Sequence, residues 1–239
     1  MKIALALAVA VVDITTCLTL ARAQVSSSVQ LADALPTPPS TGIPDGRKPA
    51  GSRGSCEETG TPLTPLLPVT DSGYSGLTLK EHPTFWFFVP YKTNNAISGK
   101  FFLEDGEENI LYRTSFKLPK TPGFVSVSIP QEKTLEVNKQ YHWQFKIYCL
   151  SGKSYQPGFV LHEGLVQRVA LPDLENQLKK ATLTERIALY IANKMWYDVP
   201  AELAKIRRHP EDWANLLRAM GLEQLEVEPI AGAVMPAQN

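Results

Sequence analysis

The feature that most constrains the fold is a stretch of strict alternation in residues 141–149. Odd positions carry large apolar side chains or sulfur, and even positions carry mostly polar ones. The odd positions are Tyr141, Trp143, Phe145, Ile147 and Cys149, and the even ones are His142, Gln144, Lys146 and Tyr148. Because successive side chains of a β-strand point to opposite faces, this pattern predicts a strand with one buried face and one solvent face.

The residues on both sides of this stretch, from about 63 to 169, form short β-type runs separated by turn signals. Residues 84–91 are continuously apolar, which predicts a strand covered on both faces. Asp105-Gly106 lies between two further runs and predicts a hairpin. In the last run, Gly164 predicts a β-bulge.

Leu135 and Tyr141 have the spacing of a tyrosine corner, in which the phenol binds the upstream backbone. This motif is typical of immunoglobulin-like and fibronectin-type domains. Together with the number of short strands, it predicts an antiparallel β-sandwich of the immunoglobulin/fibronectin-like type.

After Pro172 the apolar residues recur with a helical period, so we expect an α+β protein with a small C-terminal helical region. Thr184 is expected to cap a second helix. Pro200 and Pro210 are expected to start a third and a fourth, which Gly221 ends. These helices are short, so they need tertiary packing to be stable.

The N-terminus predicts export. Lys2 precedes an apolar run, and residues 21–23 read Ala-Arg-Ala, as at a signal-peptide cleavage site. A retained membrane anchor is the alternative, but the uncharged run is shorter than the roughly 20 residues that a spanning helix needs. A lipoprotein signal ending at Cys17 is a further alternative. We expect a periplasmic or secreted protein.

The predicted organisation has five parts. They are a signal peptide (1–23), a disordered Pro/Ser/Gly-rich linker (24–55), a β-sandwich domain (56–171), a helical appendage (172–222) and a flexible tail (223–239).

Signal cleavage would remove Cys17 and leave Cys56 and Cys149. In an oxidising compartment two remaining cysteines favour a disulfide. Two unpaired buried thiols are the alternative. A thiol nucleophile is less favoured, because Cys149 falls among the core positions of its strand.

Several motifs occur in a characteristic order. They are Arg53-Gly-Ser-Cys56, Glu81-His-Pro-Thr-Phe-Trp-Phe-Phe-Val-Pro-Tyr91, Leu118-Pro-Lys-Thr-Pro-Gly123, Leu135-Glu-Val, Tyr141-His-Trp143, Cys149, Glu163-Gly164, Arg168-Val169, Arg186-Ile-Ala-Leu-Tyr190 and Trp196-Tyr-Asp198. This set resembles the cyanobacterial family catalogued as domain of unknown function 928. The resemblance covers about residues 53–221 and implies an exported protein, but it implies no reaction.

Two groups of residues are candidate sites. Core packing is the favoured interpretation of the aromatic run, but Trp86, Phe88 and Tyr91 would form a binding patch if they were exposed together. A second candidate is a metal site formed by two histidines and one carboxylate on a shared outer sheet face. Its members are His142, His162 and Glu163, although a solvated sheet face is the favoured interpretation of these residues.

The composition and the absence of known motifs exclude several classes of function. The formal net charge of zero argues against a nucleic-acid binder with a basic surface. The sequence contains no G-x-S-x-G, P-loop or dinucleotide fingerprint. We therefore expect an exported non-catalytic interaction module without a cofactor, which binds an envelope protein or an extracellular polymer and has no membrane span after cleavage. The alternative is a metal-dependent enzyme.

Overall fold

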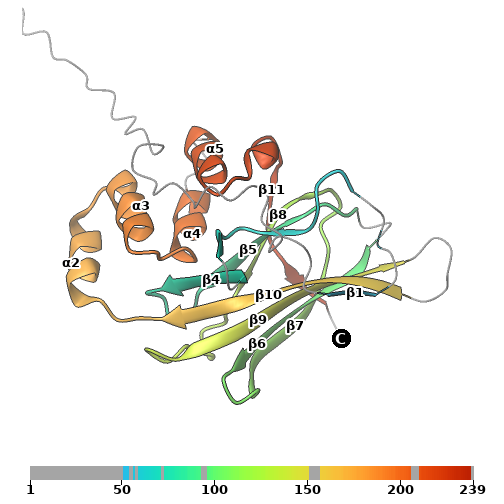
Figure 1. Ribbon diagram of the computed structural model, residues 1–239, viewed down its shortest axis with the longest axis horizontal. Coiled ribbons are helices and arrows are strands. Elements are labelled where there is room, and N and C mark those ends of the chain that lie inside the picture. The colour runs from blue at the N-terminus through green and yellow to red at the C-terminus, as the bar shows by residue number, and fades with distance from the viewer. Residues whose placement is uncertain are drawn as a thin grey trace, which may run out of the picture.

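The computed structural model describes residues 51–53, 56, 59–70, 73–92, 96–150, 157–205 and 210–237. The predicted signal peptide, residues 1–23, and the predicted linker up to residue 50 lie outside the described residues. The described chain is a mixed α+β structure with two β-sheets and a group of helices (Figure 1).

The larger sheet has eight strands in the order β12-β7-β6-β9-β10-β4-β3, and β1 also pairs with β10. Its members are β1 (Gly51–Arg53), β3 (Val69–Thr70), β4 (Gly73–Thr78), β6 (Ala96–Asp105), β7 (Ile110–Lys117), β9 (Gln140–Leu150), β10 (Pro157–Arg168) and β12 (Met235–Pro236). The hairpin predicted at Asp105-Gly106 is confirmed, since β6 and β7 pair antiparallel on either side of it.

The smaller sheet has four strands in the order β11-β8-β5-β2. They are β2 (Thr64–Pro65), β5 (Thr84–Val89), β8 (Gly123–Ser128) and β11 (Ile230–Ala233). As its continuous apolar run predicts, β5 is covered on both faces. Phe85 and Phe87 pack in a cluster with the larger sheet, and Trp86 and Phe88 pack in a second cluster with the helices.

Strand β9 contributes five side chains to the buried cluster between the two sheets. The five odd positions from Tyr141 to Cys149 are each exposed by 2 % or less, which confirms the alternation. The ring of Phe145 stacks on that of Phe87 with centroids 3.8 Å apart, so the two sheets pack face to face here.

A disulfide and a side-chain hydrogen bond fix the two ends of β9. The disulfide between Cys56 and Cys149 is present, as predicted. At the other end of the strand, the Tyr141 hydroxyl accepts a 3.0 Å hydrogen bond from the backbone N–H of Glu136, next to the buried Leu135.

The helices cover the face of the smaller sheet that points away from the larger one (Figure 1). They are α2 (Pro172–Lys180), α3 (Leu183–Ala192), α4 (Asp198–Lys205), α5 (Pro210–Ala219) and the short 3-10 helix η2 (Glu223–Leu225). Trp213 of α5 meets both Trp86 of β5 and Phe124 of β8, with ring centroids 5.9 and 5.1 Å apart.

Two helix starts differ from the prediction. Thr182, not Thr184, caps α3, because its side chain accepts from the Glu185 N–H while the Glu185 carboxylate accepts from the Thr182 N–H. Helix α4 begins at Asp198 rather than Pro200. The Asp198 carboxylate accepts hydrogen bonds from the Thr78 hydroxyl and the Leu79 N–H, both at 2.9 Å, and burial raises its pKa to about 6.

The prediction of an antiparallel sandwich is wrong for two strand pairs, since β4 runs parallel to β10 and β11 runs parallel to β8. These strands are far apart in the sequence, so no hairpin sets their direction. The bulge predicted at Gly164 is also wrong, because pairing with β9 is continuous there. A Cβ at this position would lie 2.5 Å from Trp143 Cζ2, so the glycine makes room for the indole.

Both ends of the described chain are more ordered than predicted. Within the predicted linker, residues 51–53 form β1 and pair antiparallel with β10. Within the predicted flexible tail, β11 pairs with β8 and β12 pairs with β7. Leu225 is fully buried, so the tail is fixed by apolar packing as well as by strand pairing.

Candidate functional site

The aromatic residues proposed as a binding patch belong to the core. Trp86, Phe88 and Tyr91 are 8, 2 and 6 % exposed, so they do not form the exposed patch that was the candidate binding site. The first two lie under the helices and Tyr91 lies in the cluster between the sheets. The sequence could not show that helices would cover the second face of β5.

The structure separates the three residues proposed as metal ligands. His142 lies on the solvent face of β9, where its Nε2 is 3.4 Å from a Glu163 carboxylate oxygen. His162 pairs across the sheet with Phe145 and therefore points to the opposite, buried face. Within the described residues, no group of three potential ligands could hold a metal ion, so these three residues do not form the candidate metal site.

His162 is a core residue, only 1 % exposed. Its ring meets that of Tyr74 edge-on with centroids 5.6 Å apart. Burial lowers its pKa to about 4, against a smaller opposing contribution from a hydrogen bond to the Leu63 backbone. The imidazole is therefore neutral at physiological pH.

A different group of residues stands out on the solvent face of the larger sheet. Three cations and three aromatic rings on β6, β7, β9 and β10 form what we call the cationic–aromatic patch. Its members are Lys100, Phe102, Arg113, Lys146, Tyr148 and Phe159. Arg113 is exposed and the other five are half-buried.

Strand register brings these side chains together. Phe102 lies opposite Arg113 on β7, Lys100 lies opposite Lys146 on β9, and Tyr148 lies opposite Phe159 on β10. Residues directly opposite in antiparallel strands share a face and touch. The patch therefore crosses four adjacent strands, a width of about 14 Å at the usual strand spacing.

Cation–π contacts join the two kinds of side chain. The Lys146 Nζ lies 3.7 Å from the centroid of the Phe159 ring and 5.1 Å from that of Tyr148. The Lys100 Nζ lies 5.3 Å from the Tyr148 centroid on the other side. Such contacts hold the ammonium groups beside the rings while leaving their charge available.

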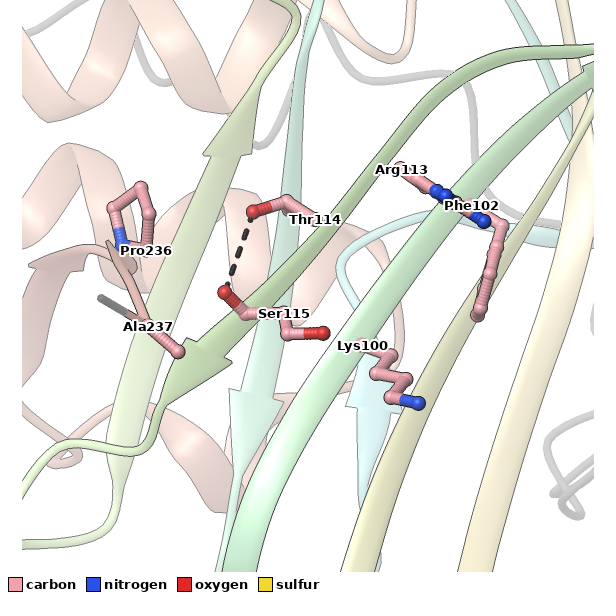
Figure 2. Close-up of a pocket in the computed structure, with 7 residues that line it drawn as sticks. All are labelled: Lys100, Phe102, Arg113, Thr114, Ser115, Pro236 and Ala237. Atoms are coloured by element: carbon pink, nitrogen blue, oxygen red, sulfur yellow. Dashed lines mark hydrogen bonds between the residues drawn. The ribbon is translucent and has the colours of Figure 1, made fainter. Parts of the chain in front are cut away.

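An open cavity of about 420 Å³, the edge cavity, adjoins the patch at the sheet edge. Figure 2 shows Lys100 and Phe102 on β6 beside Arg113 on β7, with Pro236 and Ala237 at the edge strand β12. The edge cavity is thus lined by patch side chains on one side and by the end of the described chain on the other.

Among the described residues, the solvent face of the larger sheet carries unpaired cations at one end of its strands and a carboxylate toward the other end. In the described part of the chain, no carboxylate forms an ion pair with Lys100, Arg113 or Lys146. Toward the Tyr141 end of β9, the face carries the Glu163–His142 pair instead. The patch can therefore attract anionic groups, and the neighbouring carboxylate limits where they sit.

The sequence contained a partial signal for the patch. In the alternating run of β9, Tyr148 is an aromatic residue at a solvent position, two residues after the cation Lys146 and on the same face. The sequence alone could not assign Phe102, Arg113 and Phe159 to the same patch, because their placement beside this pair depends on the register of β6, β7 and β10.

In the residues that the structure covers, no helix is both long and apolar enough to cross a membrane. A family model described as Domain of Unknown Function (DUF928) matches residues 48–230. No curated protein and no solved structure matches the chain significantly.

Proposed function

We propose, for a chain that belongs to the family Domain of Unknown Function (DUF928), a role as an exported, non-catalytic module that binds an acidic polysaccharide. The observation that carries this proposal is the cationic–aromatic patch on the solvent face of the larger sheet. Of the two partner classes expected from the sequence, an extracellular polymer fits this surface better than an envelope protein does.

Charge complementarity is the first argument. Lys100, Arg113 and Lys146 lie close together without a carboxylate partner among the described residues. An anionic polymer with regularly spaced carboxylates could pair with all three at once. Because each exposed ion pair contributes only about 0.2–1 kcal/mol, several contacts along one chain are needed for useful affinity.

The aromatic rings supply the second argument. Phe102, Tyr148 and Phe159 are half-buried on a solvent face, where polar side chains would serve a purely structural sheet equally well. Flat rings beside cations suit a ligand that has both apolar faces and negative charges. Sugar rings with carboxylate or sulfate groups have this chemistry.

The proposal also includes the immunoglobulin/fibronectin-like type of the sandwich and an extracytoplasmic location for the protein. We infer a sandwich of the immunoglobulin/fibronectin-like type with a C-terminal helical region, supported by the Tyr141–Glu136 hydrogen bond at the strand crossover. The Cys56–Cys149 disulfide supports an oxidising, extracytoplasmic compartment. Export by a signal peptide and a cyanobacterial source stay predictions, based on the N-terminal sequence and the motif resemblance.

The test is a binding titration of the full chain with polygalacturonate at low salt. Saturable binding is expected, and it should weaken as salt screens the charges. The double variant Lys100→Gln/Lys146→Gln should bind about tenfold more weakly, since two exposed ion pairs are lost. The matched control Lys80→Gln/Lys179→Gln removes the same charge elsewhere and should bind as the wild type does.

Two further polymers test the sugar and the charge separately. Neutral dextran and polyglutamate, which has charge but no sugar ring, should both bind clearly more weakly than polygalacturonate. Equal binding of dextran would contradict the role of the cations. Equal binding of polyglutamate, or an unchanged affinity in Phe102→Ser/Tyr148→Ser, would contradict recognition of a sugar.

A further inference from the structure

A second hollow, the helix cavity, lies where α2 and α3 meet the ends of β4 and β10. Its volume of about 460 Å³ falls within the usual range of small-molecule sites. The side chains that line it include Lys80, Arg168, Leu178, Lys179, Arg186 and Tyr190. It is separate from the cationic–aromatic patch and plays no part in the function proposed above.

Positive charge dominates the lining. Four cations contribute to it, against the two carboxylates Glu81 and Glu175. Glu81 already binds the Arg168 guanidinium at 2.7 Å. Within the described residues, neither Lys80 nor Lys179 forms an ion pair with a carboxylate, so the helix cavity has an excess of positive charge.

Both arginines are fixed in place by other contacts. Arg186 binds the carboxylate of Glu202 at 2.9 Å, and that side chain is only 3 % exposed. Arg168 donates to the Leu135 carbonyl oxygen at 2.8 Å. Their guanidinium groups are therefore held in one orientation, as a site that recognises an anion requires.

Each of these arginines keeps one donor unused. The Nε–H groups of Arg168 and Arg186 are buried and have no hydrogen-bond partner in the described part of the chain. A buried donor without an acceptor costs about 1–3 kcal/mol. Both arginines also line the helix cavity, so a ligand there lies beside two fixed guanidinium groups whose donors are not all used.

The remaining lining combines a phenol with apolar surface. Burial raises the pKa of Tyr190, so its hydroxyl stays protonated while it accepts a hydrogen bond from Arg186. Leu79 and Leu178 also contribute to the lining. A purely inorganic ion would leave their apolar surface uncovered.

We propose that the helix cavity binds a small molecule that carries a carboxylate or phosphate group next to an apolar group. The oxyanion pairs with the guanidinium groups of Arg168 and Arg186, which line the helix cavity. Lys80 and Lys179 add attraction, and the apolar group packs against Leu178.

The test is isothermal titration calorimetry of the full chain with three probes of similar shape. Benzoate carries a carboxylate, phenyl phosphate a phosphate, and benzyl alcohol no charge. Saturable binding of either anion supports the site, and the tighter one identifies the oxyanion. Benzyl alcohol should bind at least about tenfold more weakly than the better anion, because it lacks a charge-assisted hydrogen bond. Equal binding of benzyl alcohol, or no saturation by either anion at millimolar concentration, overturns the proposal.

Variants of the lining residues test whether the anion binds in the helix cavity. Lys80→Gln/Lys179→Gln should weaken the affinity for the better anion about three- to tenfold. Lys80→Glu/Lys179→Glu should abolish saturable binding by placing two negative charges on the lining, with circular dichroism to show that the fold is retained. The matched control Lys120→Gln/Lys194→Gln, at exposed positions outside both proposed sites, should leave this affinity unchanged. Loss of affinity in that control, or full affinity in the first double variant, overturns the assignment.

Discussion

At the scale of single residues, His162 is the clearest pH-sensitive group in the core. It is 1 % exposed and its pKa is lowered to about 4 by burial. The unfolded chain therefore binds a proton between about pH 6.5 and pH 4 that the folded chain does not bind. Stability contributed by neutral His162 is complete above about pH 6.5 and is lost as the pH falls through this window.

We predict that His162→Gln reduces the loss of stability on acidification. From the pKa shift, the wild type should lose up to about 3 kcal/mol more than the variant between pH 7 and pH 4. Urea unfolding of both proteins at several pH values measures this difference. The control is Gln144→Ala on the solvent face of β9, which removes no titratable group and should keep the wild-type pH dependence. Parallel curves for wild type and His162→Gln would contradict the assignment.

The histidines also show how far sequence reasoning reaches for a site. Alternation placed His142 correctly on the solvent face of β9. His162 was assigned to the wrong face, because the face of a residue on β10 depends on register with β9, where it lies opposite Phe145. A one-residue change of register exchanges the two faces of a strand. Candidate sites that span two strands are thus less predictable than those on one.

At the scale of elements, local patterns predict the strands well and the helix boundaries less well. The alternation of β9 and the continuous apolar run of β5 reflect burial on one and on two faces, and both are found. Threonines occur at both 182 and 184, and only the structure shows that Thr182 bonds reciprocally with Glu185. The start of α4 depends on the distant Thr78, which no local pattern reveals.

One short segment joins the helices to the larger sheet. Between α3 and α4, Tyr197 enters the cluster between the sheets, and its hydroxyl accepts a 2.7 Å hydrogen bond from the Trp143 indole. The same hydroxyl donates to the Leu165 carbonyl oxygen at 2.8 Å. Its neighbour Trp196 packs against both buried clusters. The position of α4 is therefore coupled to β9 and β10.

We predict that Tyr197→Phe lowers the free energy of unfolding by about 2–4 kcal/mol. The change leaves a buried indole N–H without its partner and removes a donor from the Leu165 carbonyl oxygen. Chemical denaturation followed by tryptophan fluorescence measures the loss. Tyr112→Phe on β7, at a half-buried position, is the matched control and should cost less than about 1 kcal/mol. A similar cost for the two variants would show that the hydroxyl of Tyr197 has no special role.

At the scale of the whole molecule, three layers share two buried clusters. The smaller sheet lies between the larger sheet and the helices, and contributes β5 side chains to both clusters (Figure 1). The cationic–aromatic patch lies on the outer face of the larger sheet, while the helix cavity lies among the helices and the strand ends. Ligands at the two sites would therefore contact different layers of one packed structure.

The disulfide acts on the molecule as a whole, because it closes a long loop in the chain. Cys56 and Cys149 are 93 residues apart, so most of the larger and smaller sheets lies between them. In the chain-entropy model, closing a loop of this length disfavours the unfolded state by about 4–5 kcal/mol. The side chains that pack with Cys149 in the buried cluster do not depend on the sulfur bond for their own contacts, so we expect the native structure to change little without it.

We predict that Cys56→Ala/Cys149→Ala folds to the same structure and loses up to about 4–5 kcal/mol of stability, measured by urea unfolding. The wild type in reducing agent should shift by a similar amount, which separates the bond from the effect of the side-chain changes. Cys149→Ala alone should equal the double variant, since it removes the same bond. Because the loss arises in the unfolded state, polygalacturonate binding by the folded double variant should match the wild type. A reduced wild type as stable as the oxidised one would show that the cross-link does not stabilise the fold, and would remove its support for an oxidising compartment.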